Sequence, residues 1–296
     1  MDIIRSVNGN TRLFGLLGNP VEHTKSPFIH NTLFSHLGIN SIYVPILVNE
    51  GDLEKAVNGL RAQNFVGFNV TVPFKKDIIK YLDDISKDAL LMGAVNTVKN
   101  INGRLKGYNT DAEGFSRDFK DGFETNFKGK RVMLLGAGGT ARALAIKLAA
   151  EGIQHLHIVN RTEQNAKNIV ELVKNNYGSI VNYILPESSK FSEEIKNSDI
   201  IINTTPAGMS TYLDSTPFDY EFAFDENQLV YDVIYAPMKT KFLKQAEEAG
   251  CRIRNGFGML INQGVSSFEI WTGKTVAKQQ AIDLLNLIIN LKDLHD

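Results

Sequence analysis

Cysteine is almost absent from this chain, since Cys251 is the only one among its 296 residues. A single cysteine excludes an internal disulfide framework and any metal cluster held by several thiolates, and it is typical of a reducing compartment. The six histidines show no spacing typical of a metal site or of a catalytic triad. We therefore expect no bound metal.

Long apolar runs and an excess of one charge are also missing. No segment approaches the roughly 20 apolar residues of a membrane-spanning helix, and the N-terminal MDIIRSVNGN has no apolar core of signal-peptide length. Because 32 Lys and Arg stand against 33 Asp and Glu, general binding to nucleic acid or anionic membranes is excluded. We expect a soluble cytoplasmic protein with a small-molecule substrate, either a monomer or a homodimer.

The clearest motif that is present lies in RVMLLGAGGTARALAIKL, residues 131–148. An apolar run reads as a buried strand, and good helix formers follow the glycines. Gly136, Gly138 and Ala141 have the G-x-G-x-x-A spacing of a dinucleotide-binding turn. Gly136 permits the tight turn. Gly138 has no side chain, so the backbone can approach the pyrophosphate, and Ala141 is small enough for the helix to pack closely on the strand. The segment predicts a dinucleotide at the start of a helix.

Strands and helices alternate on both sides of a polar segment that begins at Asp111 and leads into Lys130. Before it we expect an α/β unit in which Pro45 marks an edge or irregular strand; its strands are predicted at 13–17, 42–47, 65–70 and 94–98. After it we expect a doubly wound parallel sheet, with strands at 131–135, 155–159, 179–184, 199–202, 229–233 and 251–254. Two last helices, from Phe257 to Trp271 and from Val276 to Leu294, are expected to pack back on the first unit.

The fold class predicted is therefore α/β with two α/β domains. We expect residues 1–112 and 256–296 to form a substrate-binding, catalytic domain, and residues 113–255 to form a Rossmann-type dinucleotide domain. We expect the two to close on each other during reaction, because a reaction between a substrate on one domain and a dinucleotide on the other needs near contact and little water. The hinges should lie at the two crossings, near 111–115 and 255–258.

The second strand of the dinucleotide domain bears on which nucleotide binds. In an NAD site an acidic residue about 20 positions past the glycines bonds the ribose hydroxyls. Here the strand ends in Asn160-Arg161-Thr162, without an acid at its tip. The guanidinium group of Arg161 suits a phosphate, so we expect NADP as the cofactor. NAD remains the alternative, because Glu163 lies close by and weakens the positive field.

Several polar residues of the first domain follow strands, where ligands of open α/β sheets bind. These candidates are Thr24 and Ser26, Thr71 and Lys75, Asn96 and Thr97, and Asn109, Thr110 and Asp111. Each also has a structural interpretation: Ser26 and Asp111 as helix caps, Asn96 as a turn residue, Lys75 as a solvated lysine. Taken singly, the residues do not decide between the two.

A set of motifs along nearly the whole chain resembles the shikimate dehydrogenase family and its close quinate-using relatives. The motifs are GNPVEHTKSP, GFNVTVPFK, GAVNT, GYNTDAEGF, GAGGTARA, NRT, INTTPAGM, DVIYAPMKT and GFGMLINQG. The resemblance implies NADP-dependent, reversible reduction of 3-dehydroshikimate to shikimate, a step of chorismate and aromatic amino-acid biosynthesis.

By the same resemblance, Lys75 and Asp111 are the catalytic pair, with the lysine as acid and base. A free lysine has a pKa of about 10.4 and holds its proton at neutral pH. Desolvation lowers that pKa, whereas a nearby carboxylate favours the charged ammonium. The pair therefore either transfers the proton or mainly orients the substrate and stabilises charge.

The resemblance also implies the binding residues. Those for the substrate are Thr24, Ser26, Thr71, Lys75, Asn96, Asp111, Tyr235 and Gln263. Tyr235 can instead be a buried aromatic with a satisfied hydroxyl. Those for the cofactor are Gly136, Ala137, Gly138, Gly139, Thr140, Ala141, Asn160, Arg161, Thr162 and Thr204, with Gly258 or Met259 near the nicotinamide.

Three positions depart from the family's usual pattern. Thr24 stands in place of a serine and adds a methyl group that can shift the preference among ring substrates. Asn165 stands where NADP-using members often have a second arginine, and Thr204 replaces an alanine. The alternatives are a quinate/shikimate dehydrogenase that uses NAD or NADP, and a nucleotide-binding regulator without turnover. The presence of Lys75, Asp111, Asn96 and Gln263 argues against the regulator.

Overall fold

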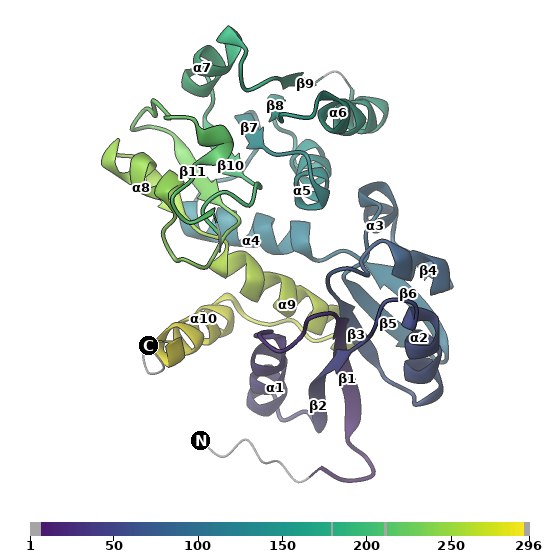
Figure 1. Ribbon diagram of the computed structural model, residues 1–296. Coiled ribbons are helices and arrows are strands. Elements are labelled where there is room, and N and C mark those ends of the chain that lie inside the picture. The colour runs from purple at the N-terminus through teal and green to yellow at the C-terminus, as the bar shows by residue number, and fades with distance from the viewer. Residues whose placement is uncertain (1–6, 179, 210–211, 293–296) are drawn as a thin grey trace. The chain divides into compact units, whose positions relative to one another are not determined.

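The computed structural model describes residues 7–178, 180–209 and 212–292 and divides into two compact units (Figure 1). Unit 1 comprises Met1–Thr110 and Ile261–Asp296, and unit 2 comprises Asp111–Leu260. Each unit contains its own six-stranded sheet with helices packed against it. The predicted α/β class is confirmed.

Unit 1 is built around the sheet β2-β1-β3-β5-β6-β4. Its elements in chain order are β1 (Arg12–Gly18), α1 (Ser26–His36), β2 (Ser41–Leu47), α2 (Leu53–Ala62), β3 (Gly67–Val70), η1 (Asp77–Tyr81), β4 (Asp84–Ile85), α3 (Lys87–Met92), β5 (Thr97–Ile101), β6 (Arg104–Tyr108) and, near the C-terminus, α10 (Lys278–Lys292). β1 pairs in parallel with β2 and β3, whereas β5 is antiparallel to β3 and β6. β2 lies at the sheet edge, as Pro45 predicts.

The strand predicted at 94–98 is wrong in position, and β6 was not predicted. Gly93 has a φ of +67° and ends α3 in the left-handed conformation, so residues 93–96 form a connection. β5 starts only at Thr97 and turns into β6 through Asn102-Gly103, both at positive φ. An Asn-Gly pair between two short runs is a strong hairpin signal, so the sequence contained the information that was overlooked.

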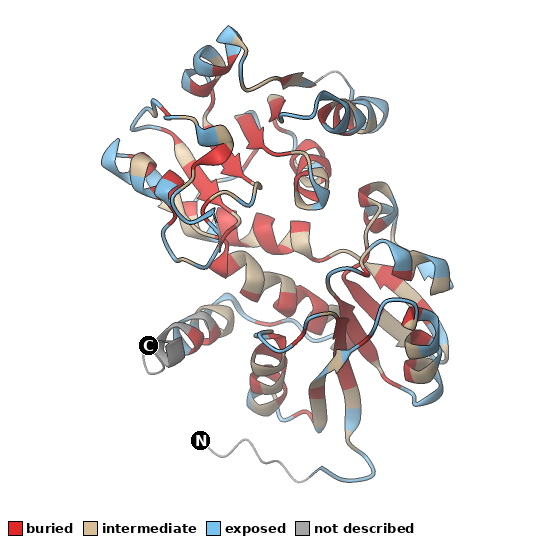
Figure 2. Ribbon diagram, viewed as in Figure 1, coloured by how far each residue is buried: buried red, intermediate tan, exposed pale blue. Residues whose placement is uncertain are grey.

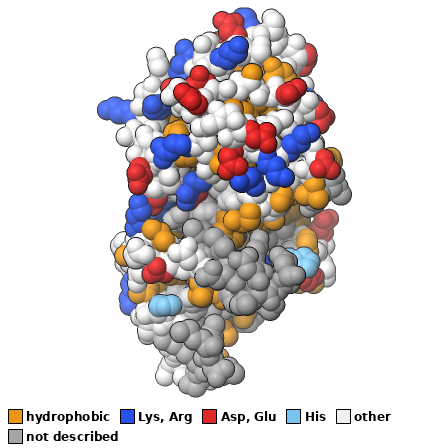
Figure 3. Space-filling model, turned by 90° about the vertical axis from the view of Figure 1, so that its left-hand side faces the viewer, with side chains coloured by type: hydrophobic (Ala, Val, Ile, Leu, Met, Phe, Trp, Pro, Cys, Tyr) orange, Lys and Arg blue, Asp and Glu red, His pale blue; other side chains and the backbone are white. Residues whose placement is uncertain are grey.

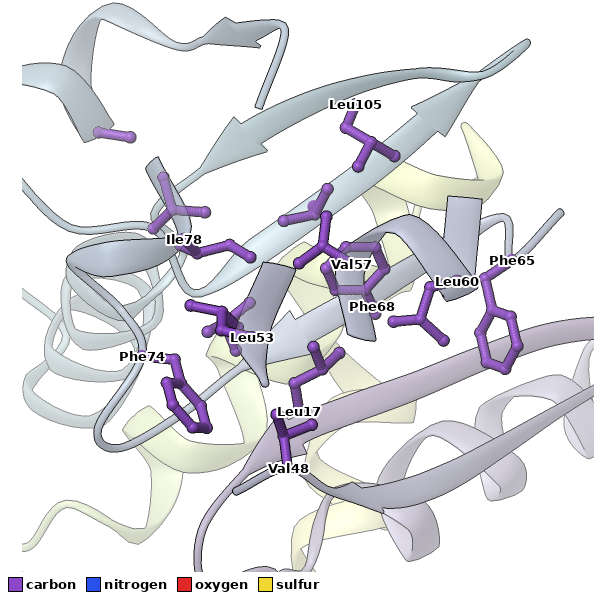
Figure 4. Packing of buried hydrophobic residues seen from close by; sticks show 14 residues of the cluster. Leu17, Val48, Leu53, Val57, Leu60, Phe65, Phe68, Phe74, Ile78 and Leu105 are labelled. Atoms are coloured by element: carbon purple, nitrogen blue, oxygen red, sulfur yellow. The ribbon is translucent and has the colours of Figure 1, made fainter. Parts of the chain in front are cut away.

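Apolar side chains fill both faces of the unit 1 sheet. On one face a cluster of 14 buried residues includes Leu17 of β1, Phe68 of β3 and Val57 of α2 (Figure 4). On the other face Phe14 of β1 packs against two aromatic rings, one from α1 and one from a helix near the C-terminus. Its ring centroid lies 4.9 Å from that of Phe34 in α1 and 5.2 Å from that of Trp271.

Unit 2 has the strand order β12-β11-β10-β7-β8-β9, and every pair in it is parallel. Its elements are α4 (Asp111–Phe123), β7 (Arg131–Leu135), α5 (Gly139–Ala150), β8 (His155–Val159), α6 (Glu163–Tyr177), β9 (Val181–Ile184), α7 (Ser189–Lys196), β10 (Ile200–Asn203), η3 (Pro217–Asp219), β11 (Leu229–Asp232), α8 (Lys241–Glu248) and β12 (Arg252–Arg254). This is the doubly wound order, with its switch point between β7 and β10. The predicted parallel sheet is confirmed.

The segment after Asp111, predicted to be merely polar, is the helix α4. Phe115, Phe119 and Phe123 recur every four residues and are all buried. They form a ring cluster with Phe127, whose centroid lies 4.3 Å from that of Phe119. The many charged residues of this segment obscured a helical apolar stripe.

The helix α9 (Phe257–Thr272) contains the boundary between the two units, at 260/261. Ile261, Phe268 and Trp271 are buried, as the predicted apolar face requires. The helix predicted from Val276 to Leu294 corresponds to α10, and its last two residues lie outside the described residues.

The central strands β1, β3, β7, β8 and β10 are mostly buried, whereas the edge strands β2, β4 and β12 are mostly intermediate or exposed (Figure 2). On the face drawn in Figure 3, basic and acidic side chains are interspersed. Across the part of the chain that the structure describes, no helix combines the length and the apolar character needed to cross a membrane.

Gly67 of β3 generates a prediction about unit 1. A Cβ atom at this position would overlap the indole ring of Trp271, whose Nε1 donates to Val98 O at 2.9 Å. We expect Gly67→Ala to destabilise unit 1 by about 1–3 kcal/mol through overpacking. Trp271 is the single tryptophan, so its fluorescence during urea unfolding reports on this unit.

Gly59→Ala is the matched control for that measurement. Gly59 lies in α2, and a Cβ there has only Gln63 Nε2 nearby, at 3.7 Å. We expect a gain of about 0.5–1 kcal/mol from helix propensity. Equal unfolding midpoints for Gly67→Ala and the wild type would contradict the packing of α9 on β3.

Candidate functional site

The glycine turn of unit 2 requires Gly136 for two separate reasons. Its φ is +106°, which L side chains rarely adopt, and a Cβ atom would lie 2.6 Å from Thr204 Oγ1. The Thr204 hydroxyl donates to Leu135 O at 2.7 Å, which holds it directly against the turn. Gly136 therefore permits both the turn and the close approach of the segment that follows β10.

Gly138 has a different environment. It is exposed at the cap position of α5, its φ is −85°, and a Cβ atom would meet nothing within 4 Å. No side chain caps the helix, so the first N–H groups of α5 remain available to an anion. Nothing in the packing of unit 2 itself requires a glycine at this position, whereas a pyrophosphate against the backbone would.

A cleft of about 310 Å³ lies beyond the carboxyl ends of β7, β8 and β10. Six predicted cofactor residues line it: Gly136, Ala137, Gly138, Asn160, Arg161 and Thr204. The remaining ones, Gly139, Thr140, Ala141, Thr162 and Gly258, are not among its lining residues. Ala141 is instead fully buried, as helix packing on the strand requires, and a Cβ at Gly258 would overlap the carboxylate of Asp118.

Sequence reasoning missed the far wall of this cleft, which comes from the segment after β10. Thr205, Pro206, Ala207, Tyr212, Ser215, Thr216, Phe218 and Asp219 line it. Phe218 and Asp219 have φ values of 61° and 55°, which non-glycine residues seldom adopt. The motif INTTPAGM covers residues 205–207 of this wall, although these were not named as cofactor residues, whereas no motif or periodic pattern marks residues 212–219.

Arg161 follows the end of β8, and the residues on either side of it form hydrogen bonds or ion pairs. Asn160 Nδ2 donates to Thr162 O at 2.9 Å, and the Arg161 side chain is exposed. Glu163 accepts from Tyr183 Oη at 2.5 Å and pairs with Lys167 Nζ at 3.0 Å. These two partners lower the pKa of the Glu163 carboxyl. Its charge is thereby partly compensated by Lys167, a position that the sequence analysis did not connect with Glu163.

In unit 1 the predicted substrate residues lie between β1 and the first residue of α1, in the turn after β3, in the connection before β5 and, in the case of Gln263, in α9. Thr24 precedes α1, and its Oγ1 accepts from Ser26 N at 3.2 Å. Ser26 is the buried first residue of α1 and not its cap, since Lys25 occupies the cap position. Lys75 is half-buried in the turn after β3, and its carbonyl oxygen accepts from Val95 N at 2.8 Å. That bond brings the Lys75 turn beside the segment that contains Asn96.

Asp111 and Tyr235 belong to unit 2. Asp111 is half-buried at the start of α4. Tyr235 is 38% exposed in the turn after β11, so the interpretation of Tyr235 as a buried aromatic is wrong. Gln263 lies in α9 within unit 1.

A buried polar network underlies the predicted substrate residues of unit 1. Asn69 of β3 is its centre: its Nδ2 lies 3.0 Å from each of Asn96 O, Thr97 Oγ1 and Ser267 Oγ. Its Oδ1 accepts from Tyr43 Oη at 2.8 Å. The Tyr43 hydroxyl also interacts with the Ser26 side chain. Ser26 and Asn96 are thus connected through side chains that sequence reasoning did not single out.

Both polar atoms of the Asn96 side-chain amide form hydrogen bonds with Thr110. Its Oδ1 accepts from Thr110 N at 2.8 Å, and its Nδ2 donates to Thr110 Oγ1 at 3.0 Å. Ser267 of α9 closes the network, with its Oγ 2.7 Å from Thr97 Oγ1 and donating to Gln263 O at 3.0 Å. Fully satisfied networks of this kind fix side-chain positions.

The layer beneath this network carries no charge. Burial raises the pKa of the Tyr43 hydroxyl well above its ordinary value. The ring of His30 stacks on Tyr43 with a centroid distance of 4.4 Å, and burial lowers the pKa of His30 to about 3. Both groups are therefore neutral at physiological pH.

Hydroxyl and amide groups dominate the unit 1 network, and these groups suit a polyhydroxylated ring better than a metal ion. Within the described ranges, no three His, Cys, Asp or Glu side chains gather as metal ligands would.

Three family models cover most of the chain in order. The substrate binding domain of shikimate dehydrogenase matches residues 16–98, shikimate / quinate 5-dehydrogenase matches 119–214, and the C-terminal domain of shikimate 5'-dehydrogenase matches 256–285. The chain belongs to the shikimate dehydrogenase family. The resemblance drawn from the motifs is confirmed.

Curated and solved relatives agree with this family membership. A shikimate dehydrogenase (NADP(+)) of Alkaliphilus metalliredigens is 41% identical over 90% of this chain and 94% of its own length. The structure of shikimate 5-dehydrogenase from Listeria monocytogenes, in complex with shikimate and NAD, has a TM-score of 0.90 at 36% identity, over 96% of this chain and 98% of that one. Quinate dehydrogenase from Corynebacterium glutamicum, in complex with NAD, has a TM-score of 0.86 at 28% identity, over 95% and 99%.

The two glycines of the turn yield contrasting predictions. We expect Gly138→Ala to lower the free energy of unfolding by no more than about 1 kcal/mol, because alanine is a poorer helix cap than glycine, and to weaken dinucleotide binding at least about tenfold, because the new methyl group faces only the cleft. We expect Gly136→Ala to lower stability by about 1–3 kcal/mol, from the positive φ and the contact with Thr204. Calorimetric titration with NADP and thermal unfolding measure the two effects.

The outcome against this interpretation is specific. If Gly138→Ala binds NADP as tightly as the wild type, the pyrophosphate does not approach the backbone at this turn.

Proposed function

We propose that this protein is an NADP-dependent shikimate dehydrogenase that reversibly reduces 3-dehydroshikimate to shikimate in the biosynthesis of aromatic amino acids. One observation carries the proposal: a substrate-binding segment of this family and a dinucleotide cleft occur in one chain, and the chain matches curated NADP-linked relatives over 90% of its length. A regulator without turnover would need no catalytic lysine and aspartate.

Lys75 and Asp111 carry the proton transfer in this proposal. Bound NADPH would supply the hydride that reduces the ring carbonyl. As the carbon gains the hydride, its oxygen becomes an alkoxide and needs one proton, which the Lys75 ammonium group donates. In the oxidation direction the neutral Lys75 amine takes the same proton back. Asp111 accepts a hydrogen bond from the substrate hydroxyl and orients the lysine.

The remaining polar residues hold the ring. Thr24, Ser26, Thr71, Asn96 and Gln263 offer hydroxyl and amide groups, each able to donate and to accept, which suits a ring with several hydroxyls and a carboxylate. Tyr235, which is 38% exposed, contributes its hydroxyl. The bonds to Thr110 support a fixed orientation of the Asn96 amide, so Asn96 loses little entropy when a substrate hydroxyl binds.

Arg161 selects NADP in this proposal. Its exposed guanidinium group lines the cleft, and the carboxylate of the adjacent Glu163 is engaged by Lys167 and Tyr183. The 2′-phosphate of NADP would pair with the arginine fork.

A second candidate is a quinate/shikimate dehydrogenase that uses NAD. The observation in its favour is the similarity to the NAD-bound quinate dehydrogenase structure, together with Thr24 in place of a serine.

Steady-state assays of both acids with both nucleotides separate the two candidates. We expect shikimate turnover with NADP to exceed quinate turnover with NAD by at least about a hundredfold in kcat/KM. Arg161→Ala should raise KM for NADP about tenfold or more and leave KM for NAD nearly unchanged, since only NADP carries the 2′-phosphate. Comparable turnover of quinate would favour the second candidate, and equal effects on both nucleotides would refute the role of Arg161.

The variant Lys75→Ala tests the catalytic assignment. We expect kcat to fall by about 10²–10⁴-fold, the usual contribution of a positioned acid or base, with a much smaller change in KM for shikimate. Lys76→Ala is the control, because Lys76 is the exposed neighbour on the same turn and should retain the wild-type rate. A Lys75→Ala enzyme with unchanged kcat would show that the proton comes from another group.

A further inference from the structure

Asp232 is a fully buried carboxylate at the end of β11 in unit 2. Three donors reach it: Asn203 Nδ2 at 3.0 Å and Ile234 N at 3.0 Å on Oδ1, and Thr240 Oγ1 at 2.7 Å on Oδ2. The three come from β10, from the turn after β11 and from the cap of α8. Neither the proposed proton transfer nor the nucleotide cleft uses this group directly.

One chain of hydrogen bonds connects Asp232 through Asn203 to the nucleotide cleft. Asn203 Oδ1 accepts from both Thr205 N at 2.9 Å and Thr205 Oγ1 at 2.7 Å, and Thr205 Oγ1 accepts from Ala207 N at 3.3 Å. Thr205 and Ala207 both line the cleft. Gly208 has a φ of +95° and packs against the Thr240 side chain. A Cβ atom added at Gly208 would lie 2.8 Å from Thr240 Cβ. The segment 204–208 is thus held from Asp232 through Asn203 and Thr240.

A second set of hydrogen bonds connects Asp232 to the residues before Tyr235. Ile234 N donates to the Asp232 carboxylate, and Val233 N donates to Asn203 O at 3.1 Å. Ile234 O in turn accepts from Gly256 N at 3.0 Å. These bonds fix the residues on the N-terminal side of the exposed Tyr235.

We propose that Asp232 is a positioning residue that sets two turns at once, the nucleotide-lining segment 204–208 and the turn that presents Tyr235. The inference deepens the proposed function and rests on it for the roles of the two turns. Asp232 touches neither substrate nor cofactor in this account and acts through Asn203 and Ile234.

Two physical arguments favour a positioning role over simple packing. A buried carboxylate costs free energy that an apolar residue of similar volume would not, and burial raises the pKa of Asp232 to about 7 despite the hydrogen bonds that lower it. An ionised carboxylate accepts hydrogen bonds on both oxygens, so Asp232 receives donors from three separate segments at once. The chain retains the costly group where two proposed binding turns meet.

Hydrogen exchange of the ligand-free protein tests the inference without any assay. Asp232→Asn keeps the size of the side chain, removes the charge and turns a donor toward Thr240. We expect the amides of Thr205, Ala207 and Ile234 to exchange about tenfold faster than in the wild type, with the amides of β7 unchanged. Asp225→Asn is the matched control, because Asp225 is an exposed carboxylate of the same unit that accepts from Asn227 and should alter none of these amides.

Kinetics then distinguish positioning from general destabilisation. We expect Asp232→Asn to raise KM about tenfold for both NADP and shikimate, whereas Thr205→Val raises only the KM for NADP and Tyr235→Phe only that for shikimate. If Asp232→Asn lowers the melting temperature while both KM values and the exchange rates at 204–208 and 234 stay at wild-type levels, Asp232 is structural and the inference is overturned. A wild-type protein without shikimate turnover would refute the proposed function, but the exchange result would still decide the role of Asp232.

Discussion

A buried polar group without a hydrogen-bond partner costs free energy, and this cost shapes both units at the ends of their strands. In unit 1 the amide of Asn69 is satisfied only when β2, β5 and α9 bring Tyr43, Thr97 and Ser267 to it. In unit 2 the carboxylate of Asp232 is satisfied only when β10 and the start of α8 bring Asn203 and Thr240. An error in the register of one of these segments would leave a donor or acceptor buried without a partner, at a cost of about 1–3 kcal/mol each. Apolar packing alone would tolerate such errors more easily.

The same cost explains why unit 1 needs residues from both ends of the chain. Ser267 and Trp271 come from α9, and they form hydrogen bonds with residues of β5 that lie 170 and 173 positions earlier in the chain. Trp271 donates to Val98 O, and Lys99 Nζ donates to Ile270 O at 2.6 Å. The helix is therefore placed along β5 by polar contacts at two successive residues. Such contacts specify one orientation, whereas an apolar face alone permits sliding.

Local motifs with a backbone mechanism could be predicted from the sequence. The glycine turn, the strand before it, the parallel order of unit 2 and the edge position of Pro45 all follow from conformational limits of single residues or from short periodic patterns. Lys75 and Asp111 were selected by the family resemblance and stay predictions. The network around Asn69 could not be derived, because it joins residues up to 198 positions apart and no short-range pattern encodes such pairs. Asn69 was nevertheless a usable signal, since it is a polar residue inside the apolar strand Gly67–Val70.

Gly136 and Gly138 show why a motif match and a physical explanation differ. Both fit the same fingerprint, yet the first is required by the protein's own backbone and by Thr204, whereas the second is required only by a ligand. Conformational need alone would retain Gly136 in a protein that had lost its nucleotide, but it gives no reason for Gly138. The presence of a glycine at an unstrained, open and exposed position is therefore the stronger sign of dinucleotide binding. Neither glycine distinguishes NADP from NAD. That choice depends on the charge at the tip of β8, where Arg161 follows a strand that contains no acidic residue.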